Sequence, residues 1–163
     1  MLLAHGGDQA TYDELTNRFE TTKEPFLRSA YLRSLGYFKQ PEIIDQALEY
    51  TLGSHVLASE TTAIPRDITR TEAGRDKVFR WLEENYETVA GRIPDEYLSY
   101  LPLMFRGCSV ATFEQRSVFF ADPEHRVPGT EANLEKALDE VRDCQTLRKR
   151  EGETVREYLS RYE

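Results

Sequence analysis

The sequence predicts an all-α protein, an array of paired antiparallel helices resembling HEAT or armadillo repeats (an α-α superhelix). Apolar residues recur at steps of three and four through most of the chain, which is the period of amphipathic helices. No segment alternates apolar and polar residues as a strand would. Proline and glycine punctuate the chain at short intervals, but no sharp repeat is visible. We therefore expect one helical-repeat domain over residues 1–163.

Three helices are expected first. Asp8 is suited to cap the first helix, and Pro25 and Pro41 to open the second and third. Gly36 and Gly53 would end the second and third helices. The second helix is expected to turn these side chains inward: Phe26, Leu27, Ala30, Tyr31 and Leu35. Residues 1–5 resemble a last helical turn without its beginning, so we expect a piece cut from a longer protein.

Residues 54–73 form a polar and poorly periodic segment. It is interpreted as a solvated connector with one short helix around residues 67–70. The central helix follows at residues 74–89. Its apolar stripe has steps of four, four and three: Val78, Leu82, Tyr86 and Val89. Phe79 and Trp81 lie off the centre of that stripe, so we expect other helices on more than one side.

The remaining chain predicts three further helices. One starts at residues 94–95 and is kinked or cut short by Pro102. A short helix opens at Thr112, with Gln115 at capping-box spacing. After a loop with two prolines, a long helix begins near Thr130 and is expected to be interrupted by Gly152.

Composition excludes several classes of function. The net charge of −8 and the pI near 5.0 argue against surfaces for nucleic acid or anionic membranes. No stretch approaches the roughly 20 apolar residues of a membrane span, and residues 1–8 do not resemble a signal peptide. Cys108 and Cys144 are too few for a disulfide scaffold and are expected to be reduced, buried thiols. A cytoplasmic protein is the simplest interpretation of these observations.

Two stretches resemble one protein family. Residues 74–89 read Gly-Arg-Asp-Lys-Val-Phe-Arg-Trp-Leu-Glu-Glu-Asn-Tyr-Glu-Thr-Val, and residues 119–142 begin Phe-Phe-Ala-Asp and end Leu-Asp-Glu-Val-Arg. Both are similar to the C-terminal helical domain of the M1 zinc aminopeptidases, the ERAP1-like C-terminal domain. Lys136 and Asp139 depart from the usual glutamine and glutamate, which puts inherited polar contacts in doubt.

The resemblance implies a parent peptidase that removes N-terminal residues from peptides with a zinc-bound water. That zinc is held by His-Glu-x-x-His on one helix face and a further Glu. Here His5, His55 and His125 have no partner histidine four residues away. We therefore expect no catalytic residue, metal or cofactor in this chain; zinc belongs to the absent catalytic domain.

By resemblance, the chain closes the active-site cavity and limits peptide access, so its partners would be the parent's catalytic domain and peptide substrates. Arg66 and Arg70 are candidates to point into that cavity and meet a peptide carboxylate. The alternative is a stand-alone α-solenoid adaptor that binds a protein partner in its concave face. A small enzyme with an unrecognised site is the least favoured hypothesis.

Overall fold

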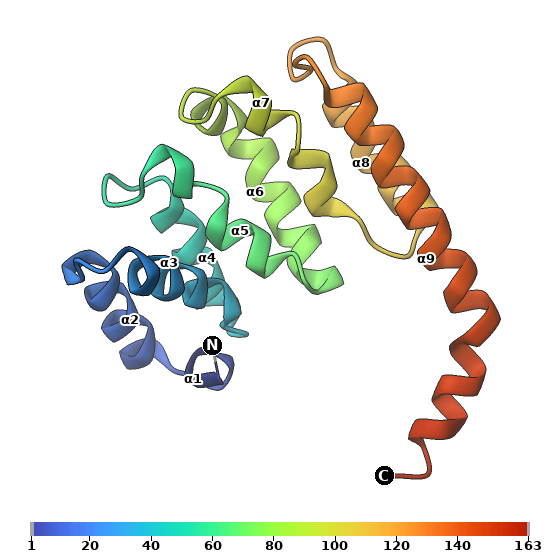
Figure 1. Cartoon of the computed structure of the whole chain (residues 1–163), viewed down its shortest axis with the longest axis horizontal. Helices are drawn as coiled ribbons and strands as arrows, with labels where there is room; N and C mark the ends of the chain where they lie inside the picture. The colour runs from blue at the N-terminus through green and yellow to red at the C-terminus, as the bar shows by residue number, and fades with distance from the viewer. Residues whose placement is uncertain (1, 163) are drawn as a thin grey trace. The chain divides into compact units, whose positions relative to one another are not determined.

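A computed structural model describes residues 2–162, whose regular structure is entirely helical (Figure 1). The all-α prediction is therefore confirmed. The chain divides into two compact units, Met1–Pro94 and Asp95–Glu163. The expectation of a single domain over residues 1–163 stays a prediction.

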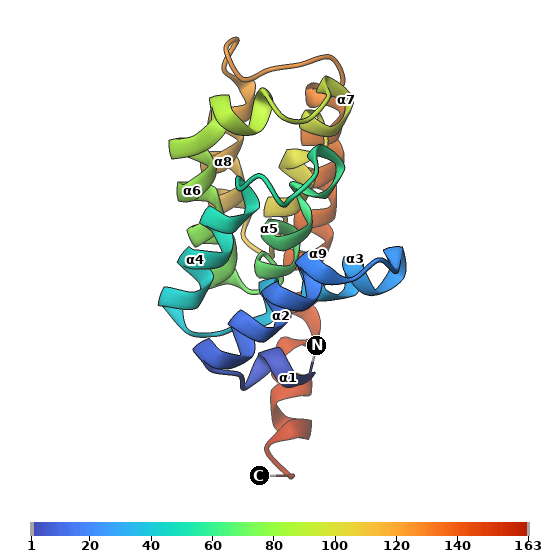
Figure 2. The ribbon, with the colours of Figure 1, turned by 90° about the vertical axis from the view of Figure 1, so that its left-hand side faces the viewer.

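Unit 1 contains six α-helices and two 3₁₀ turns within its described residues. In chain order these are α1 (Leu2–His5), α2 (Gln9–Thr21), α3 (Pro25–Ser34), η1 (Leu35–Tyr37), α4 (Pro41–Thr51), η2 (Ala58–Glu60), α5 (Ala63–Ile68) and α6 (Glu72–Ala90). Helix α5 contacts α3, α4 and α6, and Figure 2 shows it between α3 and α4. The short helix α5 is therefore central to the packing of this unit.

The predicted starts of the first three helices are confirmed. The Asp8 carboxylate accepts a hydrogen bond from the backbone N–H of Thr11 at 3.0 Å, which caps α2. Pro25 and Pro41 occupy the first turns of α3 and α4, where a missing N–H costs nothing. Local capping signals were sufficient here because they act within one helical turn.

The central helix also has the predicted buried face. The stripe of α6 is buried along its length at Val78, Leu82, Tyr86 and Val89. Phe79 and Trp81 are half-buried, as their places beside the stripe imply. The side chain of Thr71 accepts from the N–H of Gly74 at 3.0 Å and so begins the helix.

The segment expected to be a solvated connector is packed instead. Residues 54–73 contain η2 and α5, and the helix lies at Ala63–Ile68 rather than at 67–70. Its buried residues are Val56, Thr61, Ile64, Pro65, Asp67, Ile68 and Thr69. The prediction was wrong because the 6 residues of α5 are too few to show a helical period. The buried polar side chains of Thr61, Asp67 and Thr69 are hydrogen-bonded, so they can be buried without a large cost.

The inward face of α3 also differs from the prediction. Phe26 is 82% exposed and Leu27 is 40% exposed, whereas Leu32 is buried. Arg28 takes the inward position one turn before Leu32. Its guanidinium lies over the Phe19 ring at 3.9 Å and donates to the Glu60 carboxylate at 2.9 Å. A half-buried cation thus takes the inward position for which the apolar pattern favoured Leu27.

Unit 2 is built on a long helical pair. Its elements are α7 (Asp95–Leu98), η3 (Leu101–Phe105), α8 (Val110–Ala121) and α9 (Thr130–Leu159). The core cluster between α8 and α9 contains Phe113, Ala137 and Val141, with Leu103, Val110, Leu134 and Leu138 packed against it. Pro102 stands at the start of η3, so the predicted shortening is confirmed.

Two local predictions in unit 2 were wrong. Ser109 rather than Thr112 caps α8, because the Ser109 hydroxyl accepts from the Thr112 N–H at 3.3 Å. Helix α9 continues through Gly152 without interruption. A single glycine costs a helix only about 1 kcal/mol relative to alanine, which its neighbours can offset.

The two cysteines are paired rather than free. Cys108, between η3 and α8, forms a disulfide with Cys144 of α9, and their Cα atoms are 5.0 Å apart. Both residues are half-buried. The expectation of reduced, buried thiols is corrected: the packing of α8 on α9 brings together two residues separated by 36 positions.

Candidate functional site

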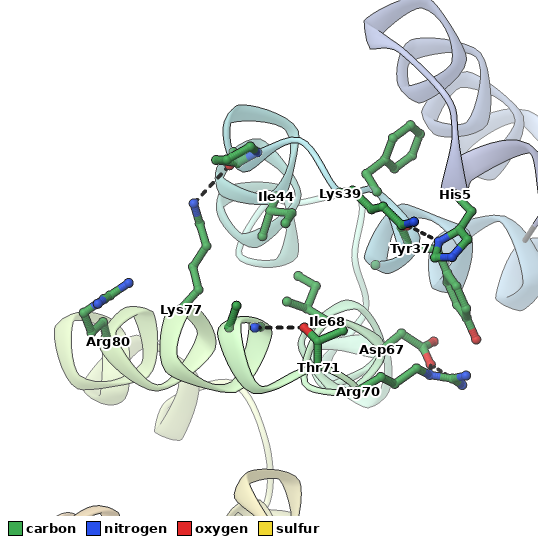
Figure 3. Close-up of a pocket in the computed structure, with 15 residues that line it drawn as sticks. His5, Tyr37, Lys39, Ile44, Asp67, Ile68, Arg70, Thr71, Lys77 and Arg80 are labelled. Carbon is green, nitrogen blue, oxygen red and sulfur yellow. Dashed lines mark hydrogen bonds and ion pairs between the residues drawn. The ribbon is translucent and has the colours of Figure 1, made fainter. Parts of the chain in front are cut away.

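A pocket of about 690 Å³ lies in unit 1 where η1, α4, α5 and α6 meet (Figure 3). Its apolar surface comes from Phe38, Pro41, Ile44, Ile68 and Ala73. Its charged lining residues are Lys39, Asp67, Arg70, Lys77 and Arg80. An apolar pocket with a few convergent charged groups is the usual form of a ligand site in proteins.

The pocket wall depends on a close approach between α5 and α6. A Cβ at Gly74 would lie 2.0 Å from the carbonyl oxygen of Ile68, so only glycine fits at the start of α6. Gly36 plays a similar part in η1, where a Cβ would lie 2.8 Å from the carbonyl oxygen of Ile64. Both glycines let neighbouring backbones touch and bring the charged residues of α5 and α6 to one rim.

Asp67 is the buried anchor of this site. Its side chain is 1% exposed and makes ion pairs with Arg33 at 2.9 Å and Arg70 at 2.8 Å. The guanidinium of Arg70 also lies over the Tyr37 ring at 4.7 Å, while its side chain stays 54% exposed. Asp67 and the Tyr37 ring therefore fix the position of the Arg70 guanidinium, and its side chain remains accessible at the pocket.

The rest of the charged lining is cationic. Lys77 donates to the carbonyl oxygen of Pro41 at 3.0 Å (Figure 3). It also pairs with Asp45, outside the pocket lining, at 2.7 Å. No ion pair joins Lys39 or Arg80 to another described residue.

Four cations thus line the pocket together with one carboxylate. Asp67 is shared by Arg33 and Arg70, and Lys77 is paired with Asp45. In a chain of net charge −8, this pocket favours an anion.

The structure separates the two arginine candidates. Arg70 lines the pocket, whereas Arg66 is exposed on α5 and outside the lining. Lys77 and Arg80 were missed by sequence reasoning. Part of their signal was present, since Lys77 and Arg80 are three residues apart and are therefore neighbours on the helix surface. Only the approach of α5 to α6 shows that this face lines a pocket.

The histidines have separate local contacts. His5 Nδ1 lies 3.5 Å from the carbonyl oxygen of Tyr37, at the edge of the pocket. His125 stacks on Phe119, and His55 Nε2 lies 3.9 Å from the Glu20 carboxylate. Over residues 2–162, no three His, Cys, Asp or Glu side chains are grouped to hold a metal ion. No helix in the same range is long and apolar enough to cross a membrane.

Comparison with known proteins identifies the class to which this fold belongs. The model of the ERAP1-like C-terminal domain matches residues 1–143, and the chain belongs to that family. This confirms the family resemblance carried by residues 74–89 and 119–142.

Its curated relatives are aminopeptidases. Aminopeptidase 2 of Candida albicans is 27% identical over 158 residues, which cover 94% of this chain and 17% of the relative. The Saccharomyces cerevisiae alanine/arginine aminopeptidase is 24% identical over 163 residues, covering 99% of this chain and 19% of the relative. A second yeast relative, aminopeptidase 2, mitochondrial, is 25% identical over 134 residues, covering 80% of this chain and 14% of the relative. The chain spans less than a fifth of each.

Proposed function

We propose that this chain is the non-catalytic C-terminal domain of an M1-type zinc metallo-aminopeptidase, working beside a catalytic domain that holds the zinc. The parent protein would hydrolyse N-terminal residues from peptides in the cytoplasm. Support comes from the family match over residues 1–143 and from the names of the relatives. The role in peptide binding is supported by the pocket around Arg70, which has an apolar surface and several cationic side chains in its lining.

In this proposal the domain closes the active-site cavity and limits which peptides enter. Arg70 meets the carboxylate at the far end of a peptide, because a guanidinium can bind a carboxylate through two parallel hydrogen bonds. Asp67 holds the guanidinium in place, and the apolar lining receives the side chain beside that carboxylate. Arg66 is proposed as a second contact, reached from the exposed side of α5.

Peptide kinetics in the intact parent protein test the role of Arg70. We expect Arg70→Gln to raise KM about threefold to tenfold for a peptide with a free C-terminal carboxylate, with kcat unchanged. For the same peptide with a C-terminal amide, we expect Arg70→Gln and wild type to have the same KM. Arg18→Gln, in a solvent-exposed pair with Glu14, is the matched control. Equal effects on acid and amide peptides would contradict the contact.

The absence of catalysis in the isolated chain is tested directly. The purified chain, supplied with zinc, is expected to leave aminoacyl fluorogenic substrates uncleaved. Turnover that depends on added metal and disappears with a chelator would contradict the non-catalytic assignment.

One observation favours the adaptor as a second candidate. The distal half of α9 exposes apolar side chains at Leu147, Val155, Tyr158 and Leu159, each more than half exposed. Such a face is typical of a surface that binds another protein segment. A protein partner captured by the chain on its own, and lost with Val155→Lys, would support the adaptor.

A further inference from the structure

The pocket around Arg70 extends along α6 to a second cationic end. Its lining residues on this helix and at its N-cap run from Thr71 to Arg80. Because Arg80 comes nine residues after Thr71, the two are about 13 Å apart along the helix axis, at 1.5 Å per residue. Figure 3 shows Asp67 and Arg70 at one end of the pocket and Arg80 at the other, with Ile68 between them.

Arg80 has a guanidinium that no described group neutralises. The residue is exposed, and neither a hydrogen bond nor an ion pair joins it to another described residue. Glu83 and Glu84 follow one turn later on α6, but neither makes an ion pair with it. Lys77, one turn earlier, is paired with Asp45 at 2.7 Å. Arg80 is therefore the cation at this end whose donors are available to a ligand.

The wall between the two cationic ends is apolar. Ile44, Ile68 and Ala73 line this part of the pocket, and Ile44 is half-buried. An extended peptide rises about 3.3 Å per residue, so about 13 Å of wall corresponds to about four peptide residues. A peptide that follows this wall from a carboxylate at Arg70 would therefore pass Arg80 about three or four residues earlier in its own chain.

We propose that Arg80 selects peptides that carry an acidic side chain about three or four residues before their C-terminal carboxylate. The inference rests on the contact proposed for Arg70, which sets the register of the peptide. The Arg80 guanidinium would donate two parallel hydrogen bonds to the acidic side chain, as guanidinium–carboxylate pairs do. Lys77 would add a second positive charge one turn away. Arg80 is thus a specificity-determining residue for the proposed substrate.

The test measures binding of labelled peptides to the full chain by fluorescence anisotropy, at about 20 mM salt so that screening is weak. Each peptide ends in leucine, as a free acid or an amide, and has Glu or Gln at the position that the spacing assigns to Arg80, here called the upstream position. We expect the acids to bind more tightly than the amides. We also expect Glu at the upstream position to tighten binding about twofold to fivefold over Gln, as for an exposed ion pair.

A further peptide keeps the net charge but moves the Glu next to the label, and is expected to bind as the Gln peptide does. If the free acid binds more tightly than the amide but Glu and Gln bind equally, the role of Arg80 is overturned and the Arg70 contact stands. The same conclusion follows if Glu acts equally at both places. If acid and amide bind equally, or no peptide binds saturably, the Arg70 contact fails and this inference fails with it.

Substitutions assign each preference to one arginine. Arg80→Gln is expected to remove the preference for Glu at the upstream position and to keep the preference for the free acid. Arg70→Gln is expected to remove the preference for the free acid. Arg18→Gln removes a guanidinium from an exposed pair outside the pocket lining, and is expected to change neither preference. Equal loss of the Glu preference in Arg80→Gln and Arg18→Gln would show a general charge effect and overturn the proposal.

Charge reversal gives a gain of binding as a second readout. Arg80→Glu is expected to bind the free-acid peptide with Lys at the upstream position more tightly than wild type does, because the new carboxylate attracts the ammonium group. Since Arg80 is exposed, neither of its substitutions is expected to disturb the fold. Weaker or equal binding of the Lys peptide by Arg80→Glu, relative to wild type, would contradict a direct contact at this position.

Discussion

The carboxylate of Asp67 and the guanidinium of Arg70 are joined at the pocket rim, with Nε donating to Oδ1 at 3.0 Å. The other carboxylate oxygen accepts from Arg33 Nε at 2.9 Å. Asp67 thus ties α3 to the end of α5 and fixes Arg70 at the same time. One buried group links the stability of unit 1 to the geometry of the proposed site.

Asp67→Asn is expected to lower the free energy of unfolding by about 1–3 kcal/mol, because both arginines lose their charged acceptor in a buried position. Asp45→Asn is the control, since the Asp45 side chain is 60% exposed in its pair with Lys77 and is expected to change stability by less than about 1 kcal/mol. Urea unfolding measures both. Equal midpoints for Asp67→Asn and wild type would contradict the anchor role.

Two glycine substitutions are expected to act in opposite directions. Gly74→Ala is expected to destabilise by about 3 kcal/mol or more, because the added Cβ meets the Ile68 carbonyl oxygen. Gly152→Ala, where the nearest atom is Arg148 Cγ at 3.8 Å, is expected to stabilise α9 by about 0.5–1 kcal/mol. Thermal unfolding checks both signs. Gly74→Ala with an unchanged Tm would show that α5 and α6 do not approach so closely.

Reduction of the Cys108–Cys144 disulfide is expected to destabilise unit 2 by about 3–4 kcal/mol. The bond closes a loop spanning 36 positions, whose freedom in the unfolded chain is restored by a dithiol reductant. Thermal unfolding with and without dithiothreitol measures the change. Cys144→Ser is the control and is expected to be insensitive to the reductant. Wild-type unfolding curves that superimpose with and without dithiothreitol would contradict the Cys108–Cys144 disulfide.

Glu60 gives a stability difference that depends on pH. Burial raises the pKa of its carboxyl, but hydrogen bonds from Arg28 and the Leu57 N–H outweigh that and hold it below its ordinary value of 4.5. The ionised group therefore stabilises the fold above pH 4.5, and this stabilisation is lost as the pH falls through the lowered pKa.

We expect Glu60→Gln to cost about 1–2 kcal/mol at pH 7 and progressively less below pH 4.5, where wild type also loses the charge. Urea unfolding between pH 7 and pH 3 measures this convergence. A difference between the two proteins that stays constant over that range would contradict the role of the ionised carboxylate.

The helices of this fold were largely predictable because their signals are local. Asp8, Pro25 and Pro41 act within one turn, and the stripe of α6 repeats often enough to be seen. The exceptions depend on distant contacts. Arg28 is inward because Phe19 and Glu60 meet it from other elements, and no pattern within α3 shows this.

The candidate site was predictable in part. Arg70 was identified from a polar segment with two arginines, but Arg33, which shares the Asp67 carboxylate with it, lies on α3, 34 positions before Asp67. Such a pair has no sequence signal without the fold. A second hollow, lined in part by Asp13 and Glu49, likewise had no sequence signal, because these residues come from α2 and α4, with α3 between them in the chain.

We propose that this chain serves as the C-terminal domain of a zinc aminopeptidase. The most direct measurement is the gene sequence read in frame upstream of the Met1 codon. We expect a His-Glu-x-x-His motif with a further downstream Glu, several hundred codons before Leu2. A native start at Met1 with no such motif upstream would contradict the claim and favour the stand-alone adaptor.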